Sequence, residues 1–156
     1  MKVHDVPPDL DTGAVLAGAQ FADAFCITVD RTTLDARRAA EKMLGRSPPW
    51  VELLLSLRHR LVAPFGLKTR APKESGADII GPFPVVSQTP DRLVAGFNDK
   101  HLDFRLVVDV AAAGQSQSVT ATTLVLTHNL LGRAYLAIIM PFHRLIVRAL
   151  LRQVAT

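Results

Sequence analysis

The clearest alternation of apolar and polar positions in the first part of the chain lies in residues 21–30. Phe25, Ile27 and Val29 alternate there with smaller or more polar side chains. Residues two apart lie on the same face of a strand, so this period predicts a half-buried strand. Strand signals return in four later segments: 79–87, 93–98, 101–112 and 118–127. The turn signals between them, at Pro90-Asp91, Asp99-Lys100 and Gly114-Gln115-Ser116, are short and therefore predict antiparallel pairing.

Two helices are predicted between the first strand and the later ones. The first runs from about Thr33 to Leu44, with Thr32 as its N-cap and Gly45 at its end. The second follows Ser47-Pro48-Pro49 and continues to about Val62. Its apolar positions recur at helical spacing: Trp50, Leu53, Leu54, Leu57 and Leu61. The polar residues 68–78 then connect to the later strands.

The longest predicted element is a helix from about Leu130 to Val154, with Asn129 as its N-cap. At 100° per residue, one broad face of this helix is apolar: Leu131, Tyr135, Ile138, Ile139, Phe142, Leu145, Ile146 and Ala149. The opposite side carries four arginines: Arg133, Arg144, Arg148 and Arg152. Pro141 removes one helical hydrogen bond, so we expect a kink there.

This order of strand, helix, helix, four strands and helix predicts an α+β fold. We expect one domain over residues 1–156, in which a curved antiparallel sheet packs around the C-terminal helix, with residues 1–18 as a loosely ordered N-terminal extension. The chain has 156 residues, of which 49% are hydrophobic and 21% charged. This is enough apolar material to bury a core, so global disorder is excluded.

The formal net charge of +4 favours contact with anions. Basic and aromatic residues are not interleaved, so we expect no nucleic-acid partner. Cys26 is the single cysteine and cannot form an internal disulfide. The polar N-terminus carries no signal peptide, and no 18-residue uncharged apolar stretch predicts stable membrane insertion. A cytoplasmic location follows as the expectation, and the oligomeric state stays open.

Four groups of residues carry a family resemblance. They are Trp50 to Leu57-Arg58 and on to Phe65-Gly66-Leu67; Ile80-Gly81-Pro82-Phe83-Pro84-Val85; Asp99-Lys100-His101-Leu102-Asp103-Phe104-Arg105; and His128-Asn129-Leu130-Leu131-Gly132-Arg133 through Tyr135-Leu136 to Pro141-Phe142-His143-Arg144. Together they resemble the bacterial domain of unknown function family 2867. The order of elements also resembles the helix-grip fold of the Bet v 1-like or START-like superfamily. That superfamily implies apolar ligand binding, with occasional enzymes such as polyketide cyclases.

The first functional hypothesis is therefore a module that binds a small apolar or amphipathic molecule between the sheet and the C-terminal helix. The sheet would contribute Phe104, Leu106 and Val108. The helix would contribute apolar side chains and two polar groups: Tyr135, Ile138, Ile139, Phe142 and His143. A single histidine at the edge of an apolar face is also common as a structural residue, so both interpretations of His143 stay open.

The second hypothesis is a cyclase- or hydrolase-type enzyme that uses His101, Asp103 and Arg105 as an acid/base and anion-holding row. Alternation along the strand places this row opposite the apolar face of Leu102, Phe104 and Leu106 (and of Val108 and Val110). The alternative is therefore an ion-pair ladder on a solvated surface.

A polar corner is also predicted where the last strand meets the long helix. There His128, Asn129 and Arg133 either bind an anion or cap and flank the helix. A third hypothesis is a peripheral membrane protein whose C-terminal helix exposes its apolar side. The five histidines show no metal-ligand spacing, and no glycine-rich nucleotide loop is present, so no metal and no cofactor is expected.

Overall fold

The computed structural model describes residues 2–8, 10, 12–30, 33–45, 49, 78–80, 83–98 and 101–155. The predicted second helix, most of the polar segment 68–78, the Asp99-Lys100 turn and the Thr32 cap lie outside these residues. The described strands are β1 His4–Val6, β2 Phe21–Asp30, β3 Ile79–Ile80, β4 Phe83–Gln88, β5 Arg92–Asn98, β6 Leu102–Ala113 and β7 Ser116–Thr127. The described helices are α1 Thr12–Val15, α2 Ala36–Leu44, α4 Leu130–Arg152 and the short 3-10 helix η2 Gln153–Ala155.

The strands form one curved sheet in the order β1-β2-β7-β6-β5-β4-β3, and every pair in it is antiparallel. The α+β prediction is confirmed, and β2 has the predicted bounds. β2 pairs with β7 over all ten of its residues, so the first long strand lies beside the last one, second from the edge that β1 forms. The predicted N-terminal extension contains β1, which pairs with β2.

The two faces of the sheet can be followed along β6, because side chains alternate between faces. Leu106, Val108 and Val110 belong to the buried core that the sheet shares with the helices. Val107 lies between them in sequence, is fully buried, and faces the other way. Asp103 and Arg105 are in phase with Val107, so they lie on the face opposite the helices.

Helix α2 covers part of the helix-facing side of the sheet, against β5 and β6. Asp35 is its N-cap, and the Asp35 carboxylate accepts a hydrogen bond of 2.7 Å from the Arg38 amide. The prediction that this helix starts at Thr33 is wrong by three residues, because Asp35 supplies the capping oxygen. Small side chains let the helix approach the sheet closely: Ala36, Ala39 and Ala40 are fully buried, with Met43 beside them.

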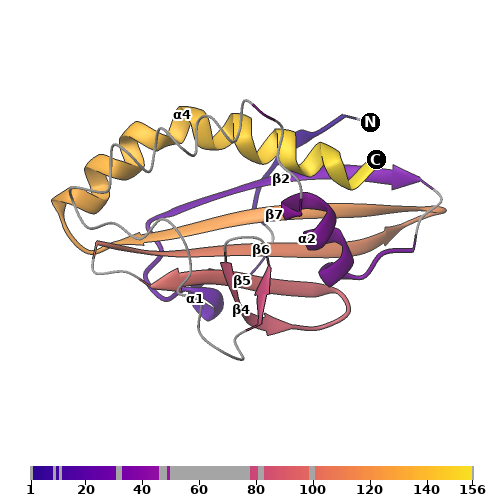
Figure 1. The fold of residues 1–156 in the computed structure, drawn as a ribbon, viewed down its shortest axis with the longest axis horizontal. Coiled ribbons are helices and arrows are strands. Elements are labelled where there is room, and N and C mark those ends of the chain that lie inside the picture. Colours follow the sequence, from indigo (N-terminus) through magenta and orange to yellow (C-terminus); the bar gives the residue numbers. More distant parts are fainter. Residues whose placement is uncertain are drawn as a thin grey trace.

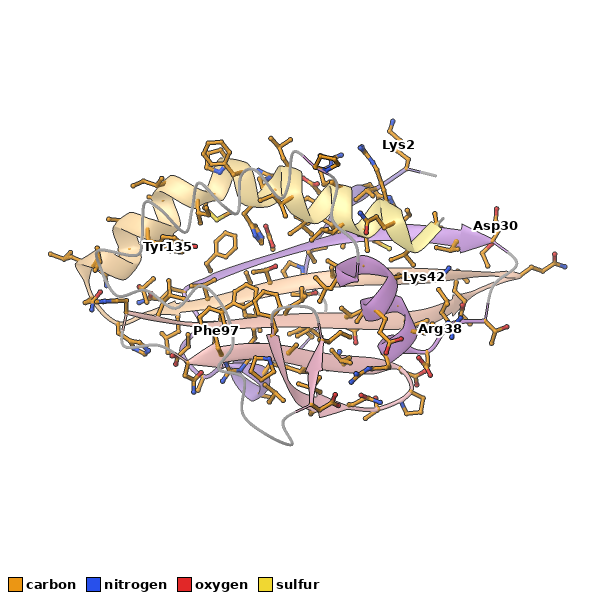
Figure 2. The ribbon with its side chains drawn as sticks, viewed as in Figure 1. Lys2, Asp30, Arg38, Lys42, Phe97 and Tyr135 are labelled. Atoms are coloured by element: carbon orange, nitrogen blue, oxygen red, sulfur yellow. The ribbon has the colours of Figure 1, made fainter. Side chains whose placement is uncertain are left out.

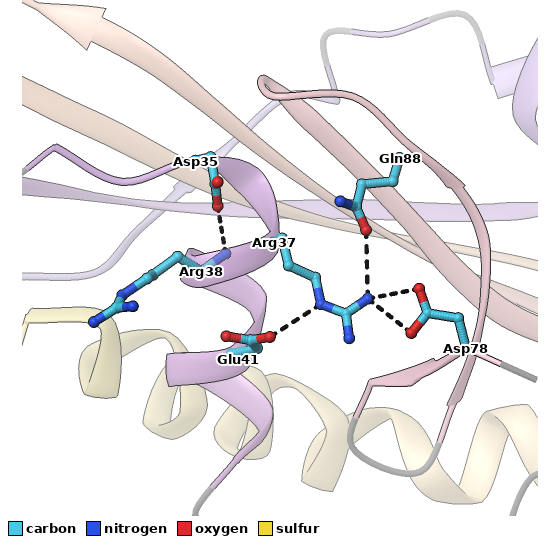
Figure 3. A network of polar contacts seen from close by, with 6 residues as sticks. All are labelled: Asp35, Arg37, Arg38, Glu41, Asp78 and Gln88. Atoms are coloured by element: carbon cyan, nitrogen blue, oxygen red, sulfur yellow. Dashed lines mark hydrogen bonds and ion pairs between the residues drawn. The ribbon is translucent and has the colours of Figure 1, made fainter.

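Arg37 ties α2 to the edge of the sheet through several acceptors (Figure 3). Its guanidinium donates to Glu41 one turn later at 3.0 Å, to Asp78 at 2.8 Å and to Gln88 at 3.4 Å. The carboxylates of Glu41 and then Asp78 raise the pKa of Arg37 above its ordinary value. The network joins α2 to the residue before β3 and to the last residue of β4, at the edge of the sheet.

Helix α4 runs along the length of the sheet beside β2, and α2 lies near its C-terminal part (Figure 1). Asn129 caps it as predicted, since the Asn129 Oδ1 atom accepts a hydrogen bond of 2.9 Å from the Gly132 amide. The helix continues through Pro141. Its buried residues lie at its start and in its C-terminal third: Gly132, Val147, Leu150 and Leu151, followed by Val154 in η2.

The predicted apolar face of α4 is not the buried one. Ile138 is 67% exposed, Leu145 57% and Phe142 42%. Two of the four arginines that were expected to point away instead contact the N-terminal segment: Arg144 pairs with Asp5 at 2.8 Å, and the Arg148 guanidinium donates to the Val3 carbonyl oxygen at 3.2 Å. The prediction is wrong because α4 is apolar around most of its circumference, so helical periodicity alone does not select the side that meets the sheet.

We predict that Leu151→Ala destabilises the protein by about 2–5 kcal/mol, because it leaves a cavity at a fully buried position. Ile138→Ala on the same helix is the matched control. It should change the free energy of unfolding by less than about 0.5 kcal/mol, because Ile138 is exposed. Chemical denaturation of both variants measures the difference. Equal losses would show that α4 packs through the face that the sequence predicts.

Candidate functional site

A pocket of about 440 Å³ lies between the N-terminal half of α4 and the ends of β2 and β7. It is a shallow hollow that is largely open to solvent. Its lining is mostly apolar and consists of Gln20, Phe21, Thr127, Arg133, Leu136, Ala137 and Met140. The helix residues of this set lie three or four apart, so they form one stripe along α4. The pocket exists where α4 has few buried side chains, between Gly132 and Val147.

Three residues of the lining carry polar side chains: Gln20, Thr127 and Arg133. The Gln20 side-chain oxygen accepts hydrogen bonds from the Thr127 amide, at 3.1 Å, and from the Thr127 hydroxyl. These hydrogen bonds fix the positions of the Gln20 and Thr127 side chains relative to each other. Arg133 is exposed, and its guanidinium supplies a positive charge beside an apolar hollow. This arrangement suits a molecule with an apolar body and an anionic end.

A pair of polar side chains lies farther along α4, between this helix and the sheet. The Nε2 atom of His143 is 3.5 Å from Oδ1 of Asp23, and both side chains are more than 80% buried. The Phe21 ring, which lines the pocket, contacts the His143 ring edge-on with centroids 6.3 Å apart. Phe21 thus separates the pocket from the Asp23–His143 pair.

The residues predicted as ligand-binding are spread over three environments. Leu106 and Val108 are part of the solid core, and Phe104 stacks with Phe83 and Phe97 at centroid distances of 5.1 and 5.8 Å. Tyr135 and Ile139 are half-buried and the His143 side chain is mostly buried, whereas Ile138 and Phe142 are exposed. Figure 2 shows Tyr135 near the N-terminal part of α4 and Phe97 on the sheet. None of the eight lines the pocket beside Arg133.

The structure joins the predicted polar corner to the start of the charged row. His128 Nε2 lies 3.0 Å from Asp103 Oδ1, and Asn129 Nδ2 donates to His101 Nδ1 at 2.9 Å. Asn129 also caps α4, so its amide links the helix to the first residue of the row. Arg133 does not take part and lies at the pocket instead.

Arg105 is separated from the acidic and imidazole groups of the row. Its guanidinium donates to the carbonyl oxygens of Phe97, at 3.2 Å, and Phe104, at 2.8 Å. Farther along β6, Asp109 accepts a hydrogen bond of 2.6 Å from Arg92 on β5, and this bond raises the pKa of Arg92. The charged row is therefore divided into a histidine-containing corner, a backbone-binding arginine and a cross-strand ion pair.

In the part of the chain that the structure describes, no group of three or more His, Cys, Asp or Glu side chains could hold a metal ion. Cys26 is buried on β2, where it contacts the Ile27 carbonyl oxygen at 3.9 Å. It therefore behaves as a packed core residue and is shielded from reagents.

The sequence contains a signal for the buried Asp23–His143 pair that the strand prediction for residues 21–30 did not use. Phe21, Asp23, Phe25, Ile27 and Val29 share one strand face, and Asp23 is the one charged residue among them. A carboxylate in phase with a core stripe predicts a buried polar interaction. The pocket had a weaker signal, the stripe of Arg133, Leu136, Ala137 and Met140 next to the predicted apolar face.

Fold and site together define an α+β protein whose antiparallel sheet and C-terminal helix enclose an apolar interior with a pocket at one end. The model of DUF2867, described as a protein of unknown function, matches residues 15–150. The chain therefore belongs to the DUF2867 family. No curated protein matches it.

Gly132 tests how closely α4 approaches the polar corner. A Cβ atom at this position would lie 2.2 Å from the His101 carbonyl oxygen. We predict that Gly132→Ala destabilises the protein by about 2 kcal/mol through overpacking, although this change usually stabilises an exposed helix. Ala134→Gly, at an exposed position two residues later, calibrates helix propensity and should destabilise by about 1 kcal/mol. Thermal denaturation checks both, and a stabilised Gly132→Ala variant would refute the close contact.

Proposed function

We propose that this protein is a binding module of the helix-grip type, with a Bet v 1-like or START-like architecture. It holds a small amphipathic molecule between the sheet and the N-terminal half of α4. The apolar body of the ligand contacts Phe21, Leu136 and Met140, and its anionic group lies at Arg133. The observation that carries this proposal is the apolar pocket with one arginine in its lining.

Size and charge both support this choice of ligand. A volume of about 440 Å³ is within the range of small-molecule sites. The described part of α4 and η2 contains arginines but no acidic side chain, so the helix itself does not repel an anion bound at Arg133. A carboxylate at Arg133 would form charge-assisted hydrogen bonds, which are stronger than neutral ones.

Catalysis by His101, Asp103 and Arg105 has less support than binding. Asp103 and Arg105 are on the face of the sheet opposite the helices, away from the pocket. Arg105 is committed to two backbone carbonyl oxygens. The row thus contains three side chains that are close in sequence, but the hydrogen bonds of the Arg105 guanidinium go to the backbone and not to Asp103 or His101.

Isothermal titration calorimetry with dodecanoate, a medium-chain carboxylate, tests the proposal. Ala137→Trp fills the pocket and should weaken binding by about tenfold or more, whereas Ala134→Trp, exposed and outside the pocket, should not. Arg133→Gln should weaken binding by roughly tenfold through the lost charge-assisted bond, and Arg152→Gln should have no effect. Native mass spectrometry of freshly purified protein identifies any ligand that it already carries. Unchanged affinity in Ala137→Trp would rule out this pocket.

A peripheral membrane role is a second candidate, because the outward side of α4 is apolar. Leu130 is 79% exposed, and Ile138, Phe142 and Leu145 are exposed along the same helix. Residues Leu130–Ala155 are long and apolar enough to cross a membrane by length and composition, and 11% of their most apolar window is buried. An apolar helix side flanked by arginines is typical of helices that lie in the membrane interface.

Co-sedimentation with vesicles tests this second candidate. We expect binding to phosphatidylcholine vesicles that contain phosphatidylserine, and weaker binding to phosphatidylcholine alone, since each basic residue near an anionic surface contributes about 1 kcal/mol. Leu145→Asp should abolish the interaction. Val86→Asp is the matched control, because Val86 is 54% exposed but lies on β4. A wild-type protein that stays in the supernatant with both kinds of vesicle excludes the membrane role.

A further inference from the structure

Two polar side chains on neighbouring strands lie on the helix-facing side of the sheet. Asp23 on β2 is the direct cross-strand partner of Thr123 on β7, so their side chains are on the same face and close together. Thr123 is 2% exposed, and the Asp23 side chain is 19% exposed. His143 approaches from α4, with Nε2 at 3.5 Å from Asp23 Oδ1. Asp23, Thr123 and His143 together form a polar cluster.

Two buried atoms of the polar cluster have no hydrogen-bond partner among the described residues: Asp23 Oδ2 and Thr123 Oγ1. Buried polar atoms of native proteins are nearly always hydrogen-bonded, because desolvation without a partner is unfavourable. His143 satisfies the other Asp23 oxygen and does not account for Oδ2. Both open atoms belong to directly opposed side chains on one face of the sheet, so one small polar group between them could satisfy them together.

The chemistry of these two atoms selects the group. A carboxylate oxygen only accepts hydrogen bonds, whereas a threonine hydroxyl both donates and accepts. A hydroxyl on a ligand could donate to Asp23 Oδ2 and accept from the Thr123 hydroxyl. A second carboxylate would be repelled by Asp23. An ammonium group could donate to both atoms, but it offers no acceptor for the proton of the Thr123 hydroxyl.

The polar cluster continues from the pocket in both elements. Asp23 is two residues beyond Phe21 on the same face of β2, and His143 is three residues beyond Met140 on α4. Arg133 and His143 are ten residues apart, which corresponds to about 15 Å along the helix. A chain with an anionic group at Arg133 and its other end past the Phe21 ring would reach the cluster.

We propose that Asp23 and Thr123, positioned by His143, bind a hydroxyl group at the far end of the ligand. The ligand class is then a medium-chain hydroxy acid, with its carboxylate at Arg133 and its hydroxyl at the polar cluster. This assignment rests on the proposed function, because it extends the same pocket. The Phe21 ring lies between the two sites and must turn aside when such a ligand binds.

The test compares two ligands that differ by one hydroxyl group, dodecanoate and ω-hydroxydodecanoate, by isothermal titration calorimetry. The wild-type protein should bind the hydroxylated ligand about tenfold more tightly, as expected for a hydrogen bond to a charged group. Thr123→Val, which keeps the side-chain shape, should reduce this preference severalfold and leave the affinity for dodecanoate unchanged. Asp23→Asn should reduce the preference as well, which gives a second route if one variant does not fold.

Thr122→Val is the matched control. Thr122 is 1% exposed, next to Thr123 in β7, but its side chain points to the other face of the sheet. It should keep the full preference for the hydroxylated ligand.

The outcomes separate the two proposals. If neither ligand binds, the proposed function fails, and with it the extension to a hydroxyl. If both bind with equal affinity to the wild-type protein, the pocket stands and the hydroxyl site is wrong, as it would be if water satisfied the two atoms. If the preference for ω-hydroxydodecanoate persists in both Thr123→Val and Asp23→Asn, the proposed hydroxyl site is also wrong.

Discussion

The arrangement of this protein depends on where the long C-terminal helix is held against the sheet. At its start, Gly132 allows α4 to pass within contact distance of the His101 carbonyl oxygen. In its last third, Val147, Leu150 and Leu151 enter the core that α2 and the sheet share. Between these two attachments the helix buries little apolar surface. A helix fixed at both ends and lightly packed in the middle leaves room for a pocket without loss of the fold.

The same middle section accommodates polar side chains that a solid core would exclude. Asp23 and His143 face each other there, and Thr123 lies next to Asp23 on the sheet. Elsewhere on this face, the strands carry apolar side chains such as Phe25 and Ile27. Buried polar groups are tolerated where partners satisfy them, and under α4 the Asp23 and His143 side chains partner each other.

The charged surface has a structural role that complements this interior. Arg37 joins α2 to Asp78 and Gln88, and Arg92 pairs with Asp109 across β5 and β6. Arg144 and Arg148 connect α4 to Asp5 and lie over the Phe25 ring, each 6.0 Å from its centroid. These contacts attach both helices to the sheet by their edges, and they leave the outward side of α4 apolar and exposed.

The sequence by itself determined the long strands, the antiparallel pairing of strands joined by short turns and the Asn129 cap, because period-two alternation, short turns and capping chemistry are local properties of the chain. It missed β1 and merged β3 with β4 into one strand. It also contained the family resemblance. It could not determine which side of α4 meets the sheet, since Ile138 and Phe142 are as apolar as Val147 and Leu151. Nor could it bring Asp23 to His143, which is 120 residues away in the chain. Only the tertiary structure decided these points, because they depend on how distant segments pack and not on the preference of any one segment.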